Sequence, residues 1–180
     1  MPSKSSRHLV APELGALIDV FLPMNFSEGI EPVRAGLTSR EAVPLPSELA
    51  VVRREERFLP VPGSAPDVRV LLYTPPGEAK GLRPAVLYFH GGGFVIGNAD
   101  MGDVQMRQMV LELGCVAVSV DYRLAPETPW PGALNDNYAA LCWFAENATK
   151  LHVDPRRIAV LGESAGAGHA AALAIHARNK

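Results

Sequence analysis

The sequence contains little cysteine and no long apolar run, and each of these absences excludes a class of protein. Two of its 180 residues are cysteines, Cys115 and Cys142, which cannot build a disulfide framework and lack the spacing of metal ligands. We expect both to be buried as small hydrophobic side chains. No apolar stretch approaches the roughly 20 residues of a membrane-spanning helix, and the first thirty residues mix charges with prolines, unlike a secretory signal peptide. The sequence therefore predicts a cytoplasmic chain without a metal or other cofactor.

An excess of charge of one sign is also missing. The chain carries 17 Lys and Arg against 19 Asp and Glu, so its formal net charge is -2 at pH 7, and the two signs are interspersed. This pattern offers no basic surface to nucleic acid or to an anionic membrane, and we expect neither partner. Internal repeats and low-complexity segments are absent as well, and 48% hydrophobic residues are enough for a soluble domain with a sizeable core.

The amino-terminal third is interrupted by prolines, which favours short elements. Apolar residues recur at near-helical spacing over 9–22 and predict an amphipathic helix that ends before Pro23. A second short helix is expected over 38–42. We interpret residues 1–50 as an appendage and residues 51–180 as the main domain.

Beyond residue 84 the pattern changes to near-continuous apolar runs separated by helical segments. The runs cover 85–89, 115–120 and 158–161, and the helices cover 104–113, 134–148 and 165–177. Such alternation is typical of an α/β fold in which buried parallel strands have helices on both faces. Two earlier strands, 51–59 and 68–73, can pair as a meander, and the charged residues of the first predict an exposed edge strand.

A candidate nucleophile lies where the last apolar run turns into the last helix. The segment Gly162-Glu163-Ser164-Ala165-Gly166 places a serine at the apex of this turn. Glycines two residues before and after the serine give the backbone the room that a sharp strand-to-helix turn needs. The turn would hold the Ser164 hydroxyl exposed at the positive end of the following helix. The alternative, a glycine-rich turn with an uninvolved serine, stays open on these five residues alone.

A glycine loop follows directly on the first apolar run, in the segment His90-Gly91-Gly92-Gly93-Phe94. Three glycines at the carboxyl end of a buried strand leave backbone N–H groups uncovered on the side where α/β sheets bind ligands. Acyl transfer needs such donors, aimed at the oxyanion that develops in the transition state. The alternative interpretation is a flexible glycine turn.

Together with two further segments, this loop resembles the hormone-sensitive-lipase branch of the α/β-hydrolase esterases. The three motifs are His90-Gly91-Gly92-Gly93-Phe94, Asp121-Tyr122-Arg123-Leu124-Ala125-Pro126-Glu127 and the segment 154–166. The resemblance covers about residues 84–168, and residues 1–50 are similar to that family's lid. It implies an α/β-hydrolase fold, with a mostly parallel sheet, and an esterase that acts on short to medium acyl esters through a serine acyl-enzyme.

The resemblance also implies a role for each matching residue. Ser164 would be the nucleophile. The oxyanion would be held by the backbone N–H groups of Gly92, Gly93 and Ala165. His90 and Gly91 would brace the glycine loop, so that His90 would not be the catalytic base. Phe26, Phe94 and the lid helix are candidates for the wall of the substrate pocket.

The segment that follows Val120 looks architectural in the same family. Asp121, Tyr122 and Glu127 would anchor loops beneath the site. Two peptide bonds, Ala125-Pro126 and Trp130-Pro131, are candidates for cis geometry.

The sequence lacks two of the three groups that a catalytic serine needs, a histidine that accepts its proton and a carboxylate that orients the histidine. In this fold both follow the serine in the chain, yet the residues after Ser164 contain no Asp or Glu. His169 and His176 lie on the helix that begins at the serine, where their rings should face the sheet or another helix. We expect His8 and His152 to be surface residues.

We therefore expect the chain to be the amino-terminal portion of an esterase, with little or no turnover by itself. The strand 158–161, central in this family's sheet, would be left with an unpaired apolar edge, which a second chain or a missing carboxyl-terminal segment would complete. Two alternatives stay open. One is a catalytically inactive protein that binds a small molecule on the same scaffold, as the gibberellin receptor of plants does, and the other is a non-functional fragment of a longer esterase.

Overall fold

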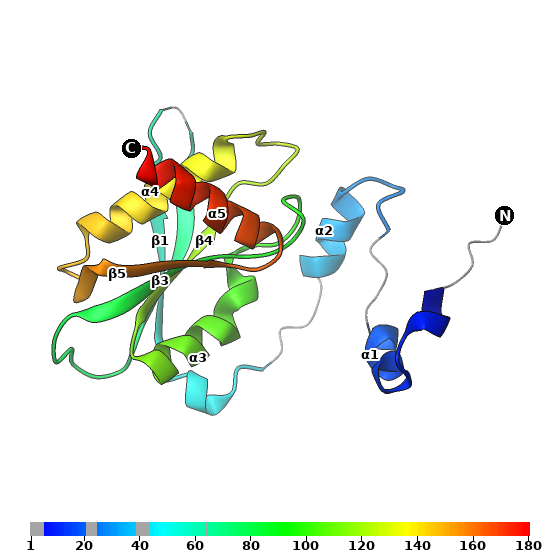
Figure 1. Cartoon of the computed structure of the whole chain (residues 1–180), viewed down its shortest axis with the longest axis horizontal. Helices are drawn as coiled ribbons and strands as arrows, with labels where there is room; N and C mark the ends of the chain where they lie inside the picture. Colours follow the sequence, from blue (N-terminus) through cyan, green and yellow to red (C-terminus); the bar gives the residue numbers. More distant parts are fainter. Residues whose placement is uncertain (1–5, 21–24, 39–43, 64) are drawn as a thin grey trace. The chain divides into compact units, whose positions relative to one another are not determined.

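The computed structural model describes residues 6–20, 25–38, 44–63 and 65–180 (Figure 1). The chain divides into two compact units, residues 1–39 and residues 40–180. The first unit contains the 3-10 turns η1 (Ser6–Leu9) and η2 (Pro12–Leu14) and the helices α1 (Gly15–Val20) and α2 (Glu31–Thr38).

The first unit corrects two expectations about helices. The predicted helix over 9–22 is broken into turns before α1, because Pro12 has no N–H to donate to the preceding turn; residues 21 and 22 lie outside the described part. A helix also occurs before Thr38, since Pro32 stands in the first turn of α2, where its missing N–H costs nothing. Most of the helix predicted over 38–42 falls outside the described residues.

The second unit is built on a five-stranded mixed sheet. Its strands are β1 (Arg53–Leu59), β2 (Val68–Thr74), β3 (Arg83–Phe89), β4 (Val116–Asp121) and β5 (Val153–Gly162). They lie in the order β1-β2-β4-β3-β5. The strands β4, β3 and β5 are parallel, and β2 and β1 extend them as an antiparallel meander. All five strands and the meander were expected from the sequence.

Helices cover both faces of this sheet (Figure 1). The buried side chains of β2, β3 and β4 divide between two clusters, one on each face. The helices α4 (Gly132–Glu146) and α5 (Ala165–Arg178) lie on one face, and α3 (Asp103–Leu113) lies on the other. Leu87 and Phe89 of β3 pack toward α4 and α5, whereas Tyr88 packs with Met106 on the α3 side. Burying each of these large apolar side chains contributes about 1.5–3 kcal/mol. The α/β architecture is thus confirmed.

The strand β5 forms one edge of the sheet. Among the described strands it pairs with β3 alone, and Ala159 in its middle is exposed. The apolar run 158–161 was expected to be buried on both faces, and this is wrong, because Ala159 is exposed and its neighbours are only half-buried. The unpaired apolar edge that the sequence predicted is present in this unit.

The cysteines are both free. Cys115 is fully buried just before β4, as expected. Cys142 was also expected to be buried, but it is only half-buried, because its position on α4 is partly open to solvent. In the described part of the chain no cluster of potential ligands could hold a metal ion, and no helix is long and apolar enough to cross a membrane.

Candidate active site

Ser164 lies at the junction of β5 and α5 in a strained backbone conformation. Its φ of 50° and ψ of -115° fall in the left-handed region that a residue with a side chain rarely adopts. Its side chain is exposed. A hydroxyl held in this way at the start of a helix is available to a ligand.

Two glycines make this turn possible through close backbone contacts. A Cβ atom on Gly162 would lie 2.1 Å from the Gly166 carbonyl oxygen, and one on Gly166 would lie 2.0 Å from the Phe89 carbonyl oxygen. Both distances are far inside van der Waals contact, so any side chain would force the strand and the helix apart. The turn occurs where the glycine spacing predicted it.

The glycine loop lies against this turn. A Cβ atom on Gly91 would be 3.2 Å from the Glu163 carbonyl oxygen and 3.6 Å from the Ser164 Cβ. Several backbone N–H groups of the loop and the turn donate no hydrogen bond within the described part of the chain, those of Gly91, Gly92, Gly93, Phe94, Ser164 and Ala165. The three donors expected from the sequence, Gly92, Gly93 and Ala165, are among these free N–H groups.

His90 is fully buried beneath the loop and braced on two sides. Its ring stacks on Tyr122 with the centroids 4.2 Å apart, and its Nδ1 lies 2.7 Å from the Gly91 carbonyl oxygen. Because a carbonyl oxygen can only accept, the neutral ring carries its proton on Nδ1. Burial lowers the pKa of His90, although the Gly91 carbonyl and Asp121 oppose this shift. Among the described residues, no hydrogen bond joins this buried ring to the Ser164 hydroxyl.

Asp121 and Tyr122 anchor the loops below the site, as the sequence suggested. The Tyr122 hydroxyl donates to the His90 carbonyl oxygen at 2.6 Å. The Asp121 carboxylate accepts the Ala99 N–H at 3.1 Å and pairs with Arg69 at 3.0 Å. Both expected cis peptide bonds, Ala125-Pro126 and Trp130-Pro131, are present.

His169 is buried on the first turns of α5, and its ring packs against two loops. It meets Phe94 edge-to-face, with the centroids 5.0 Å apart, and Tyr122 at 4.4 Å. Burial lowers its pKa, and neighbouring His90 lowers it further. No hydrogen bond joins His169 to Ser164 among the described residues, and the Nε2 atom of His169 has no partner.

The remaining histidines have other surroundings. His176 packs edge-to-face on Tyr138 of α4. His152 and, in the first unit, His8 are exposed, as the sequence predicted. The pattern of the sequence could not reveal the contact of His169 with Phe94, because the two residues meet only when α5 docks on the sheet. The one available signal was the position of His169 five residues after the serine, one and a half turns along the same helix.

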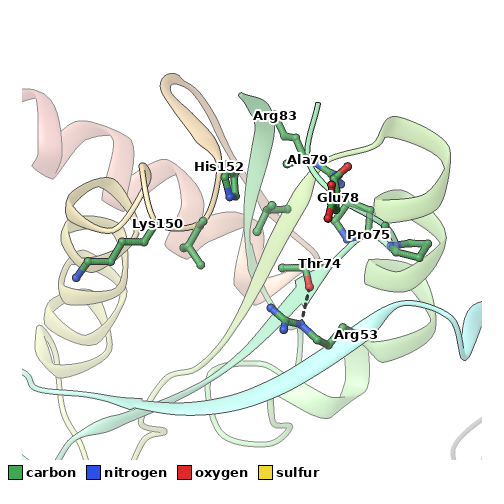
Figure 2. Close-up of a pocket in the computed structure, with 12 residues that line it drawn as sticks. Arg53, Thr74, Pro75, Glu78, Ala79, Arg83, Lys150 and His152 are labelled. Carbon is green, nitrogen blue, oxygen red and sulfur yellow. Dashed lines mark hydrogen bonds between the residues drawn. The ribbon is translucent and has the colours of Figure 1, made fainter. Parts of the chain in front are cut away.

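Two of the cavities formed by the described residues of the second unit lie at opposite ends of the parallel strands. The larger, of about 640 Å³, lies at the amino ends of β3 and β4, and Figure 2 shows Arg53, Arg83 and His152 around it. Ser164 and the glycine loop lie at the carboxyl ends, where open α/β sheets bind ligands. The smaller cavity, of about 320 Å³, is lined by Phe94, Gly168 and His169 and so adjoins the serine.

This sheet order, the helices on both faces and the serine at a strained strand-to-helix turn define an α/β-hydrolase fold. A model of the family described as alpha/beta hydrolase fold matches residues 86–180. The chain belongs to this family, in its hormone-sensitive-lipase-like branch of esterases.

Sequence relatives carry esterase names. The carboxylesterase NlhH of Mycobacterium tuberculosis is 42% identical over 172 residues, which cover 94% of this chain and 52% of the relative. The esterase LipI of the same organism is 42% identical over 157 residues, 87% of this chain and 48% of the relative. The chain thus spans about half the length of the curated relatives that it matches.

Solved structures of esterases also superpose on this chain. A bacterial heroin esterase superposes with a TM-score of 0.84 at 35% identity, over 97% of this chain and 55% of that one. The thermostable carboxylesterase EstE1 superposes with a TM-score of 0.68 at 43% identity, over 83% of this chain and 48% of that one. The expected fold and family are confirmed.

Proposed function

We infer that the protein hydrolyses carboxylic esters of short to medium acyl length through an acyl-enzyme on Ser164. The observation that carries this proposal is the exposed Ser164 hydroxyl beside three backbone N–H groups without an acceptor. The esterase names of its relatives support the reaction class.

The chemistry follows from this arrangement. The Ser164 oxygen attacks the ester carbonyl carbon, and the electron pair of the C=O bond moves to the carbonyl oxygen. The resulting oxyanion accepts hydrogen bonds from the N–H groups of Gly92, Gly93 and Ala165, each worth about 2.7–4 kcal/mol in the transition state. The alcohol then leaves with a proton, and water releases the acid from the serine. His90 and Gly91 hold the loop in place.

A base must take the serine proton in the first step, and a carboxylate must orient that base. In the described residues no histidine is hydrogen-bonded to Ser164. We therefore expect the 180-residue chain to retain only the roughly 10³–10⁴-fold acceleration that the oxyanion donors and binding supply without a triad. A second chain or a further segment paired with the free edge of β5 would complete the sheet and the triad.

The proposal extends to the domains of the whole protein and to its location in the cell. Residues 1–50 would act as a lid over the site, residues 51–180 would belong to the catalytic domain, and the protein would work in the cytoplasm. A protein that binds a small molecule without turning it over is the second candidate, because a cavity of about 320 Å³ adjoins a serine to which no described histidine is hydrogen-bonded.

The test is labelling of Ser164 by a fluorophosphonate probe, measured by mass spectrometry. We expect weak labelling or none in the 180-residue chain, strong labelling in the full product of the gene, and no labelling in either after Ser164→Ala. Strong labelling of the 180-residue chain that Ser164→Ala abolishes would show that the base is already present. Hydrolysis of ethyl butyrate by the full product that survives Ser164→Ala would refute the proposed mechanism.

A further inference from the structure

The smaller cavity lies within one helical turn of the candidate nucleophile. Gly168 lines it, and the Gly168 N–H donates to the Ser164 carbonyl oxygen at 3.4 Å. Phe94, at the end of the glycine loop, forms a second wall. The volume of about 320 Å³ is at the lower end of the range for small-molecule pockets. The cavity is therefore large enough for one ring and close enough to receive part of a molecule held at Ser164.

The walls of this cavity are mostly apolar, and Phe94 is held in place by its neighbours. Its lining includes the rings of Phe94 and Trp130, which are 45% and 70% exposed. The Phe94 carbonyl oxygen accepts the Ala125 N–H at 2.9 Å, and its ring packs on that of His169. The remaining apolar lining consists of Ala125, Ala133 and Ala172. Two aromatic faces in such a setting favour an aromatic guest, because rings attract one another edge-to-face or offset.

The cavity offers no free charge, although Arg123 lines it. The guanidinium of Arg123 donates to both carboxylate oxygens of Asp136, with its shortest contact at 2.7 Å, and the Asp136 side chain is fully buried. The pair therefore neutralises itself. His169 is buried and adds no charge either, since burial lowers its pKa. A charged guest would lose its hydration without gaining an unpaired partner.

We propose that this cavity is a binding site for a neutral aromatic ring, and that it receives the ring of an aryl-containing ester whose carbonyl lies at Ser164. The assignment of the ring to an ester substrate rests on the proposed esterase function, whereas the binding of an aromatic ring does not.

Binding is tested on the 180-residue chain with three probes that share one ring and differ in charge. They are benzyl alcohol, benzoate and benzylammonium. The chain has two tryptophans, so a proton–nitrogen correlation spectrum shows two indole N–H signals, and Trp143→Phe identifies them. We expect benzyl alcohol to shift the Trp130 signal and to leave the Trp143 signal in place. Both ions should bind at least tenfold more weakly. No shift of Trp130, or equal binding of all three probes, would overturn the proposal.

Filling the cavity provides the matched control. Ala172→Phe should weaken benzyl alcohol binding at least tenfold, whereas Ala171→Phe, at an exposed position of the same helix, should not change it. If Ala172→Phe does not fold, Gly168→Ala narrows the cavity, because the new Cβ would lie 3.5 Å from the Phe94 ring in ordinary contact. Binding that none of these changes affects would place the probe elsewhere and refute the site.

The link to the substrate is tested with the full product of the gene. Ala172→Phe should lower kcat/KM for ethyl phenylacetate or phenyl acetate at least tenfold relative to ethyl butyrate. If benzyl alcohol binds but both aryl esters are unaffected, the cavity binds free aromatic molecules and the assignment to substrate fails. The proposed esterase function is independent of this result, because Ser164→Ala with ethyl butyrate tests it separately.

Discussion

At the scale of single residues, the candidate site depends on backbone atoms more than on side chains. In the proposed mechanism Ser164 would supply the reactive side chain, and its neighbours would contribute backbone N–H groups and the space that a missing Cβ atom leaves. Gly162 and Gly166 have no room for a Cβ atom, so the position of the serine depends on the absence of side chains around it.

Two substitutions in one helix test this dependence. Gly166→Ala should lower the free energy of unfolding by about 3 kcal/mol, because its Cβ would overlap the Phe89 carbonyl oxygen. Gly168→Ala is the control, since its Cβ meets only the Phe94 ring at 3.5 Å, and it should raise helix stability by up to about 1 kcal/mol. Urea unfolding measures both. Equal effects of the two substitutions would contradict the steric account of the turn.

The buried histidines should make stability depend on pH. Burial lowers the pKa of His90 and of His169 below 6.5, so below that pH the unfolded chain binds protons that the folded chain does not. Stability is then full above 6.5 and falls as the pH decreases, by up to about 1.4 kcal/mol per pH unit for each histidine. The groups that face His169 are His90, Tyr122 and Asp136.

Urea unfolding at pH 7.5 and pH 5.5 measures this effect. His169→Leu should reduce the loss of stability between the two values, since it removes one of the two groups. A loss that His169→Leu leaves unchanged would show that His169 is protonated equally in the folded and unfolded chains.

At the scale of elements, the two edges of the sheet differ in their protection. The edge strand β1 carries charged residues that pair with one another and with neighbouring loops, including Arg53 with Glu55 at 2.9 Å. The other edge, β5, exposes Ala159 in an apolar run. Charged side chains prevent the association of edge strands, and an apolar edge without them invites it.

We therefore expect the 180-residue chain to associate through β5 as its concentration rises. Ala159→Lys should increase the monomer fraction in sedimentation experiments, because a charge on this edge opposes pairing. Phe58→Lys on β1, also at an exposed position, should have no such effect. A chain that is monomeric at every concentration would contradict the prediction.

At the scale of the whole molecule, the core belongs entirely to the second unit. The buried hydrophobic residues extend from Leu49 to Leu173, and no described residue of the first unit with an assigned burial is buried. The contribution of residues 1–39 to stability should therefore be small.

Removal of residues 1–39 tests this division. The remaining chain should unfold cooperatively, with a midpoint within about 4 °C of the intact chain, which corresponds to less than about 1 kcal/mol for a domain of this size. Thermal circular dichroism measures the transition. Loss of cooperative unfolding would mean that the first unit is part of the core, and not a separate appendage.

The sequence by itself determined the order of strands and helices along the chain, the edge position of β1 and the sharp turn at Ser164. The order along the chain follows from continuous apolar runs such as 85–89, and the edge position of β1 follows from its charged residues. The turn depends on contacts between residues close in the chain, such as Gly162 and Gly166. The prediction of helix bounds from the sequence failed where a proline could either break a helix or begin one, as at Pro32 in α2.

The tertiary structure alone decided which distant groups meet. The insertion of β4 between β2 and β3 arises when distant strands pair. The contact of Gly91 with Glu163 and the packing of His169 on Phe94 arise when β5 and α5 join the sheet. No local periodicity encodes such contacts, because they join residues from different strands and loops. The role of the glycines in the turn could therefore be predicted from the sequence. The cavity beside the serine, which aromatic rings line, could be recognised only in the folded molecule.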